Sequence, residues 1–81
     1  MKLNYQIALN EFGLIFNSAT KETFAANTVG TDILNYIKLG MSRSQIEEKI
    51  LAKYDIDKDT LDNDITEFFH DLNMNHLITP L

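Results

Sequence analysis

The chain has 81 residues, of which 7 are Lys or Arg and 12 are Asp or Glu, giving a formal net charge of -5. One hydrophobic core usually serves about 100 to 200 residues, so we expect a single domain over residues 1–81 with no room for a deep catalytic cavity. The acidic balance disfavours phosphate backbones and anionic membranes as partners. The absence of cysteine excludes disulfides, cysteine-ligated metals and thiol catalysis.

The hydrophobic residues are spread along the chain and make up 44% of it, which is typical of a globular protein. No apolar run reaches the ~18 residues that a bilayer span requires. The N-terminal residues alternate polar and apolar side chains, whereas a signal peptide begins with a continuous apolar stretch. We therefore expect a cytoplasmic protein.

The first third of the sequence predicts three strands. A period of two places one set of apolar side chains on a single face of a half-buried strand: Leu3, Tyr5, Ile7 and Leu9. A turn at 10–13 precedes a short apolar run at 14–16, and a polar turn without glycine at 18–21 precedes a third extended stretch at 22–26. Short turns between successive strands favour a three-stranded antiparallel sheet.

After residue 27 the apolar period becomes that of a helix. Asn27 is a suitable N-cap for a helix over 28–39, and Ser42 with Gln45 matches the capping box of a second helix. Asp57 is a suitable N-cap for a third, whose apolar residues recur at spacings of four, three and four: Leu61, Ile65, Phe68 and Leu72. The predicted class is α+β, with a three-stranded antiparallel sheet followed by three helices, similar to a winged helix-turn-helix.

The candidate catalytic and metal-binding patterns fail on spacing. An EF-hand loop counted from Asp55 would place Thr60 where glycine is required and Thr66 where a bidentate glutamate is required. His70 and His76 lie roughly 120° apart around a helix, which is unfavourable for sharing one ion. No serine lies in a nucleophile elbow or in the setting of a phosphopantetheine carrier. We expect no enzyme activity, no cofactor and no bound metal.

A winged-helix regulator that binds DNA is the alternative that this order of elements allows. In that arrangement the third helix would enter the major groove. Residues 58–71 carry one Lys against five Asp or Glu, so docking this helix on phosphates would be repulsive. Nucleic acid is therefore the less favoured partner.

Phe68 and Phe69 are adjacent and lie about 100° apart on the third helix. If one faces the core directly, the other lies at its margin. Two interpretations follow: both rings close the core over the sheet, or one lines a groove between this helix and the third strand.

The order of these segments resembles the PqqD family. The resemblance covers nearly the whole chain and rests on seven segments: 13–17, 22–27, 28–34, 42–46, 54–57, 61–72 and 77–78. It implies a winged-helix-like chaperone that binds the leader segment of a ribosomally made precursor peptide, in the biosynthesis of either pyrroloquinoline quinone or an unrelated modified peptide. The domain would deliver the peptide to a separate modifying enzyme, in many cases a radical SAM enzyme, without being catalytic itself.

In this family the leader adds as a strand beside the third strand and rests against the last helix, which is β-augmentation. The resemblance therefore implies a peptide-binding site formed by Thr23, Phe24, Ala25, Ala26, Ile65, Phe68, Phe69 and Leu72. Carboxylates of the third helix, including Asp64 and Asp71, are either a solvated face or an attraction for basic leader residues. A free strand edge would also allow a homodimer through pairing of two copies.

Overall fold

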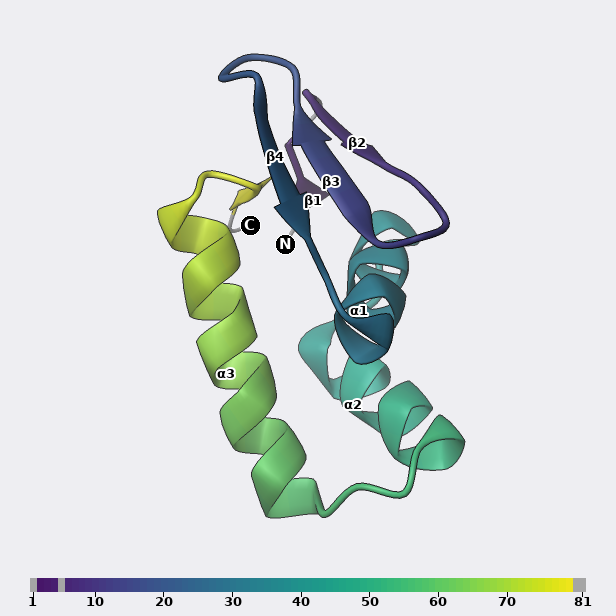
Figure 1. The fold of residues 1–81 in the computed structure, drawn as a ribbon. Coiled ribbons are helices and arrows are strands. Elements are labelled where there is room, and N and C mark those ends of the chain that lie inside the picture. The colour runs from purple at the N-terminus through teal and green to yellow at the C-terminus, as the bar shows by residue number, and fades with distance from the viewer. Residues whose placement is uncertain (1, 5, 80–81) are drawn as a thin grey trace.

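A computed structural model of the protein describes residues 2–4 and 6–79 (Figure 1). The elements in chain order are β1 (Lys2–Leu3), β2 (Ile7–Leu9), β3 (Leu14–Asn17), β4 (Glu22–Ala25), α1 (Thr28–Lys38), α2 (Arg43–Lys53), α3 (Lys58–Met74) and β5 (Ile78–Thr79). The sheet formed by β2, β3 and β4 is antiparallel, with β3 in the centre. The predicted α+β class with three such strands and three helices is confirmed.

The turn between β3 and β4 is held by a buried side chain. The Oδ1 atom of Asn17 accepts hydrogen bonds from the backbone N–H groups of Ala19 at 3.0 Å and Thr20 at 3.3 Å. These bonds satisfy a side chain that is only 4% exposed. Lys21 adopts the left-handed conformation, with φ of 65°, at the end of this glycine-free turn. The Asn17 side chain therefore stabilises a turn that holds Lys21 in a conformation that glycine adopts more easily.

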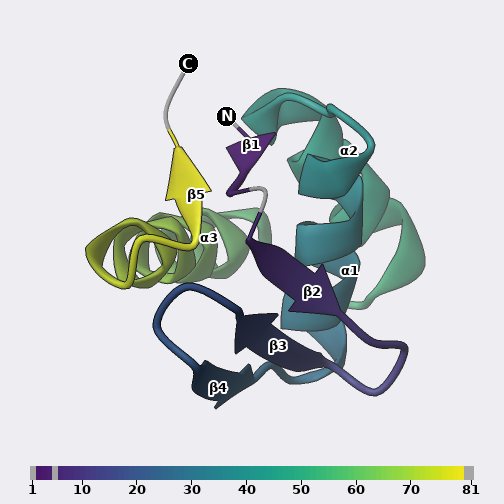
Figure 2. The ribbon, with the colours of Figure 1, turned by 90° about the horizontal axis from the view of Figure 1, so that it is seen from above.

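The prediction of one continuous strand from Leu3 to Leu9 is wrong. β2 pairs with β3, but β1 leaves the sheet and pairs with β5, so that Leu3 lies opposite Ile78. Figure 2 shows this separate two-stranded pair beside the main sheet. The pairing joins the two ends of the chain, and local alternation of polar and apolar residues carries no information on so distant a partner. Tyr5, which belonged to the predicted face, lies outside the described residues.

All three predicted helix N-caps are confirmed. The Asn27 side chain accepts from the Gly30 N–H at 2.8 Å, and Asp57 accepts from the N–H groups of the first turn of α3. Ser42 and Gln45 form both hydrogen bonds of a capping box, at 2.9 and 3.2 Å. These bonds satisfy amides that have no partner within their own helix. The caps fix where each helix begins, including α1 directly after β4.

The core lies where the three helices meet the inner face of the sheet. Six large side chains in it are almost completely inaccessible to solvent: Leu34, Ile37, Ile46, Ile50, Leu61 and Ile65. Burying each such side chain stabilises the fold by about 1.5 to 3 kcal/mol. Because this core uses one face of the sheet only, the other face and the outer edge of β4 remain at the surface. Among the helices of the described part, none has both the length and the apolarity to cross a bilayer.

Candidate functional site

β4 forms a free edge of the sheet. β3 separates it from β2, and within the described residues no strand pairs with its other side (Figure 2). The Ala26 N–H donates to the Gly13 carbonyl at 2.8 Å, so the Ala26 N–H points toward the β3 side, while the Gly13 N–H donates to the Asn10 carbonyl. Hydrogen-bonded pairs alternate along antiparallel strands, so Phe24 also bonds to β3. The N–H and C=O groups of Thr23 and Ala25 therefore point away from the sheet.

Gly13 allows the chain to come close to the end of β4. It has a φ of +84°, and a Cβ atom at this position would lie 2.5 Å from the Ala26 carbonyl oxygen. A side chain is thus excluded both by the backbone conformation and by the contact. The turn that contains Gly13 fixes Ala26, and with it the direction in which β4 leads into α1.

An apolar hollow lies between β4 and α3, which we call the β4–α3 hollow. It has a volume of about 380 Å³. Its lining residues are Ile15, Phe24, Ala25, Ala26, Asn27, Phe68, Asp71, Leu72, Asn75 and Leu77. Most of these side chains are apolar, and the polar ones on the helical side are Asp71 and Asn75. An extended segment beside β4 would therefore find backbone partners on the strand and apolar contacts on the helix.

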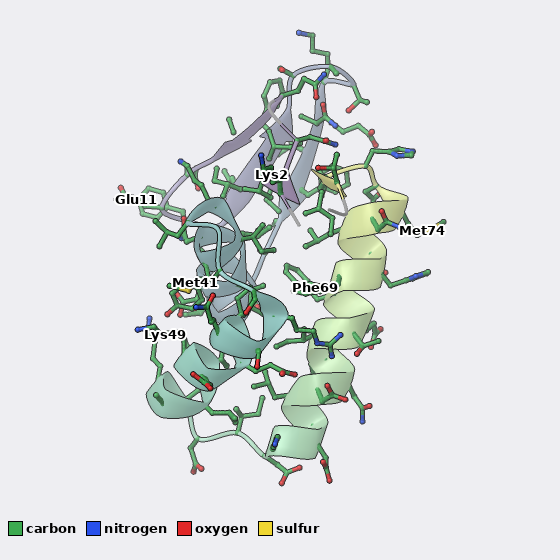
Figure 3. The ribbon with its side chains drawn as sticks, turned by 180° about the vertical axis from the view of Figure 1, so that it is seen from behind. Lys2, Glu11, Met41, Lys49, Phe69 and Met74 are labelled. Atoms are coloured by element: carbon green, nitrogen blue, oxygen red, sulfur yellow. The ribbon has the colours of Figure 1, made fainter. Side chains whose placement is uncertain are left out.

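The residues predicted for the helical side of the site separate into three positions. Ile65 and Leu72 are buried, with 0% and 3% exposure, so they form the base of the site rather than its surface. Phe68 is half-buried and lines the β4–α3 hollow. Phe69 packs toward α2 instead, with the Arg43 guanidinium carbon 5.8 Å from the ring centre. Figure 3 shows Phe69 pointing from α3 toward the other two helices.

A second hollow, the α1–α3 hollow, was not anticipated from the sequence. It also has a volume of about 380 Å³ and is lined by Asn27, Val29, Gly30, Ile33, Ile56, Leu61, Asp64, Ile65, Glu67, Phe68 and Asp71. Three of these residues also line the first hollow: Asn27, Phe68 and Asp71. The apolar period of α1 indicates which face of the helix points inward, but it does not show that part of this face lines a hollow beside α3. Gly30 lets the Phe68 ring come close to α1 at the edge of this hollow, because a Cβ atom at Gly30 would lie 3.3 Å from the ring.

Two hydrogen bonds to one carboxylate of α1, one of them from an ammonium group, join α1 to the end of α2. One carboxylate oxygen of Asp32 accepts from the Lys53 ammonium at 2.8 Å and from the Tyr54 hydroxyl at 2.5 Å. The bond from Lys53, followed by that from Tyr54, lowers the pKa of Asp32 below its usual value. Asp32 is thus stabilised as a carboxylate, and we assign to it the structural role of holding α1 against α2.

We expect Asp32→Asn to reduce the free energy of unfolding at neutral pH, with the difference from the wild type disappearing in acid. A carboxyl group with a lowered pKa in the folded state stabilises the fold fully above its unfolded-state pKa of about 3.9. That contribution is lost as the pH falls through the lower pKa of the folded state. Urea unfolding at pH 6 and in steps below about pH 4 measures both effects. An equal difference at every pH would contradict this role of the ionised Asp32.

Within residues 2–4 and 6–79, no three His, Cys, Asp or Glu side chains are grouped so that they could hold a metal ion. The features that distinguish the site are the free edge of β4 and the two hollows beside it. They fit an extended chain better than a small polar molecule, because their backbone groups and apolar contacts follow the direction of a strand.

Two solved structures share this fold. One, "TbiB1 in Complex with the TbiA(beta) Leader Peptide", is 21% identical with a TM-score of 0.91, and the match covers 100% of this chain and 98% of that one. The other, "Lasso peptide synthetase B1 complexed with the leader peptide", is 18% identical with a TM-score of 0.84, covering 98% and 96%. Identities this low establish the fold alone.

The family of this chain is established by a match of its sequence to a family model. No curated protein matches the chain. The family model of coenzyme PQQ synthesis protein D (PqqD) matches residues 13–78, which include β3, β4 and all three helices. The match thus contains both sides of the β4–α3 hollow, and the chain belongs to the PqqD family.

Proposed function

We propose that this protein binds the leader segment of a ribosomally synthesised precursor peptide and presents it to a separate modifying enzyme. The observation that carries the proposal is the free edge of β4 beside the apolar β4–α3 hollow. The outward N–H and C=O groups of Thr23 and Ala25 would pair with the peptide backbone. Membership in the PqqD family and the two similar structures, each of a complex with a leader peptide, support this choice of ligand.

Strand addition accounts for both affinity and selectivity. Backbone hydrogen bonds to β4 would be available to any extended peptide, whereas side chains in a strand alternate between two faces. Every second side chain of the added strand would therefore point toward the β4–α3 hollow. Phe24, Phe68 and Leu72 line this hollow, and apolar leader residues would fill it.

Binding and presentation by this route require neither a catalytic residue nor a cofactor. The chemistry would take place in the partner enzyme, for which we propose the radical SAM class from the family resemblance. The fold supplies a rigid strand edge, and the leader supplies the segment that becomes ordered on it. We accordingly assign the protein a recognition role, in the cytoplasm where precursor peptides are made.

DNA binding is not favoured as an alternative. The exposed surface of α3, which a winged-helix regulator would insert into the major groove, carries Asp62, Asp64, Glu67 and Asp71. Four carboxylates would have to approach the phosphates of the duplex. The same helix therefore fits a peptide better than a nucleic acid.

Fluorescence anisotropy titration tests the function. The probes are labelled synthetic peptides that correspond to the N-terminal halves of short open reading frames beside the gene, and a labelled DNA duplex is the control. We expect saturable binding of one peptide at micromolar or lower concentration, and no binding of the duplex at the same salt concentration. Binding of the duplex with no response to any peptide would contradict the proposal.

A further inference from the structure

The groove beside β4 does not end where the strand ends. The β4–α3 hollow and the α1–α3 hollow share Asn27, Phe68 and Asp71, so they adjoin each other at the beginning of α1. The second hollow has an apolar base to which Val29 and Ile33 of α1 contribute. A peptide that pairs with β4 and continues past the end of that strand, toward the beginning of α1, would reach this second hollow.

The open side of the α1–α3 hollow is acidic. Asp64, Glu67 and Asp71 all line it and are all exposed. Their spacings of three and four place them along one side of α3. Among the described residues, none of the three takes part in a salt bridge, and no Lys or Arg lines either hollow. The α1–α3 hollow thus combines an apolar base with a negatively charged open side.

We propose that the bound peptide extends into the α1–α3 hollow with an apolar side chain next to a Lys or Arg. The apolar side chain would contact Val29 and Ile33, and the cation would lie near Asp64, Glu67 and Asp71. This inference rests on the proposed function and adds to it the chemical class of the peptide. Opposite charges across such an interface favour the cognate peptide, and like charges exclude acidic ones.

Selection from a displayed library of random dodecapeptides tests the charge preference. Three proteins are compared: the wild type, an Asp64→Asn/Glu67→Gln/Asp71→Asn variant, and a Glu48→Gln/Asp55→Asn/Asp59→Asn control with the same net charge. We expect the wild type and the control to enrich Lys or Arg beside an apolar residue, and the first variant to lose this enrichment. Its dissociation constant for a peptide selected on the wild type should rise about fivefold at low salt.

Val29→Phe tests whether the hollow itself is used. The larger side chain fills the space from the α1 side, and we expect it to weaken binding of the selected peptide about tenfold. Asn35→Phe, on an exposed position of α1, is the matched control and should bind as the wild type does. Urea unfolding confirms that both variants are folded.

The outcomes separate this inference from the proposed function. If peptides bind and depend on the edge of β4, but show no basic preference and are insensitive to Val29→Phe, the inference is wrong and the proposed function stands. If no peptide is enriched, or if the selected peptides bind equally to an Ala25→Pro variant, both are wrong. The inference is supported if the basic preference is lost in the Asp64→Asn/Glu67→Gln/Asp71→Asn variant but kept in the control, and if Val29→Phe also binds more weakly.

Discussion

Ala25→Pro is expected to weaken leader-peptide binding about tenfold or more while leaving the protein folded. The Ala25 N–H points away from β3, so its loss removes no hydrogen bond of the sheet. Proline does remove a donor that an added strand would use, and its ring hinders the close approach of another backbone. The free energy of unfolding should change by no more than about 1 kcal/mol.

Two further variants make this comparison specific. Ala25→Ser keeps the N–H and changes the side chain by one oxygen atom only, so it should bind the peptide nearly as the wild type does. Phe24→Pro removes a donor that bonds to β3 and should destabilise the sheet. Anisotropy titration gives the affinities, and urea unfolding gives the stabilities. Wild-type affinity in a folded Ala25→Pro protein would show that the peptide does not pair with β4.

Phe68→Ala should mainly weaken peptide binding, whereas Phe69→Ala should mainly reduce the free energy of unfolding, although the two residues are adjacent. Phe68 is half-buried and lines both hollows, so its truncation should cost about 2 kcal/mol of binding free energy. Phe69 packs against α2 beneath Arg43 and should contribute mainly to stability. Because Phe69 is only half-buried, we expect a loss of about 1 to 3 kcal/mol, below the range for a fully buried ring.

Arg43→Gln provides a control for the Phe69 position, since it removes the cation near the ring and the Arg43 hydrogen bonds to Asp62 and Thr66 of α3, and leaves the hollows intact. It should reduce stability slightly and leave affinity unchanged. Peptide titrations and urea unfolding of the same preparations separate the two quantities. The assignment of the two rings would be contradicted if Phe69→Ala lowered affinity at wild-type stability, or if Phe68→Ala lowered stability alone.

The features that the sequence predicts correctly are local. Asn27, Ser42 and Asp57 cap helices because a side chain bonds amides only two or three residues away, and such spacings are visible in the sequence. β3 and β4 are likewise neighbours joined by a short turn. The partner of β1 is at the other end of the chain, so nothing near Leu3 reveals that it leaves the sheet to pair with Ile78.

The candidate site likewise combines features that the sequence predicts with packing that it does not. The small residues of β4 and the apolar stripe of α3 can be found from periodicity, but their division into core and surface cannot. Ile65 and Leu72 belong to the stripe and are buried, whereas Phe68 in the same stripe is half-buried because α3 stands away from β4 near it. That separation depends on how α3 packs on α1 and α2. Phe69 faces α2 for the same reason.

Amide hydrogen exchange at β4, resolved by NMR with and without a bound leader peptide, tests strand addition most directly. Thr23 and Ala25 should exchange rapidly in the free protein and become protected in the complex, because their N–H groups point to the free edge. Phe24 and Ala26, whose N–H groups point to the β3 side, should change little. We therefore expect protected and unchanged amides to alternate along β4. Equally fast exchange of Thr23 and Ala25 in a saturated complex would contradict it.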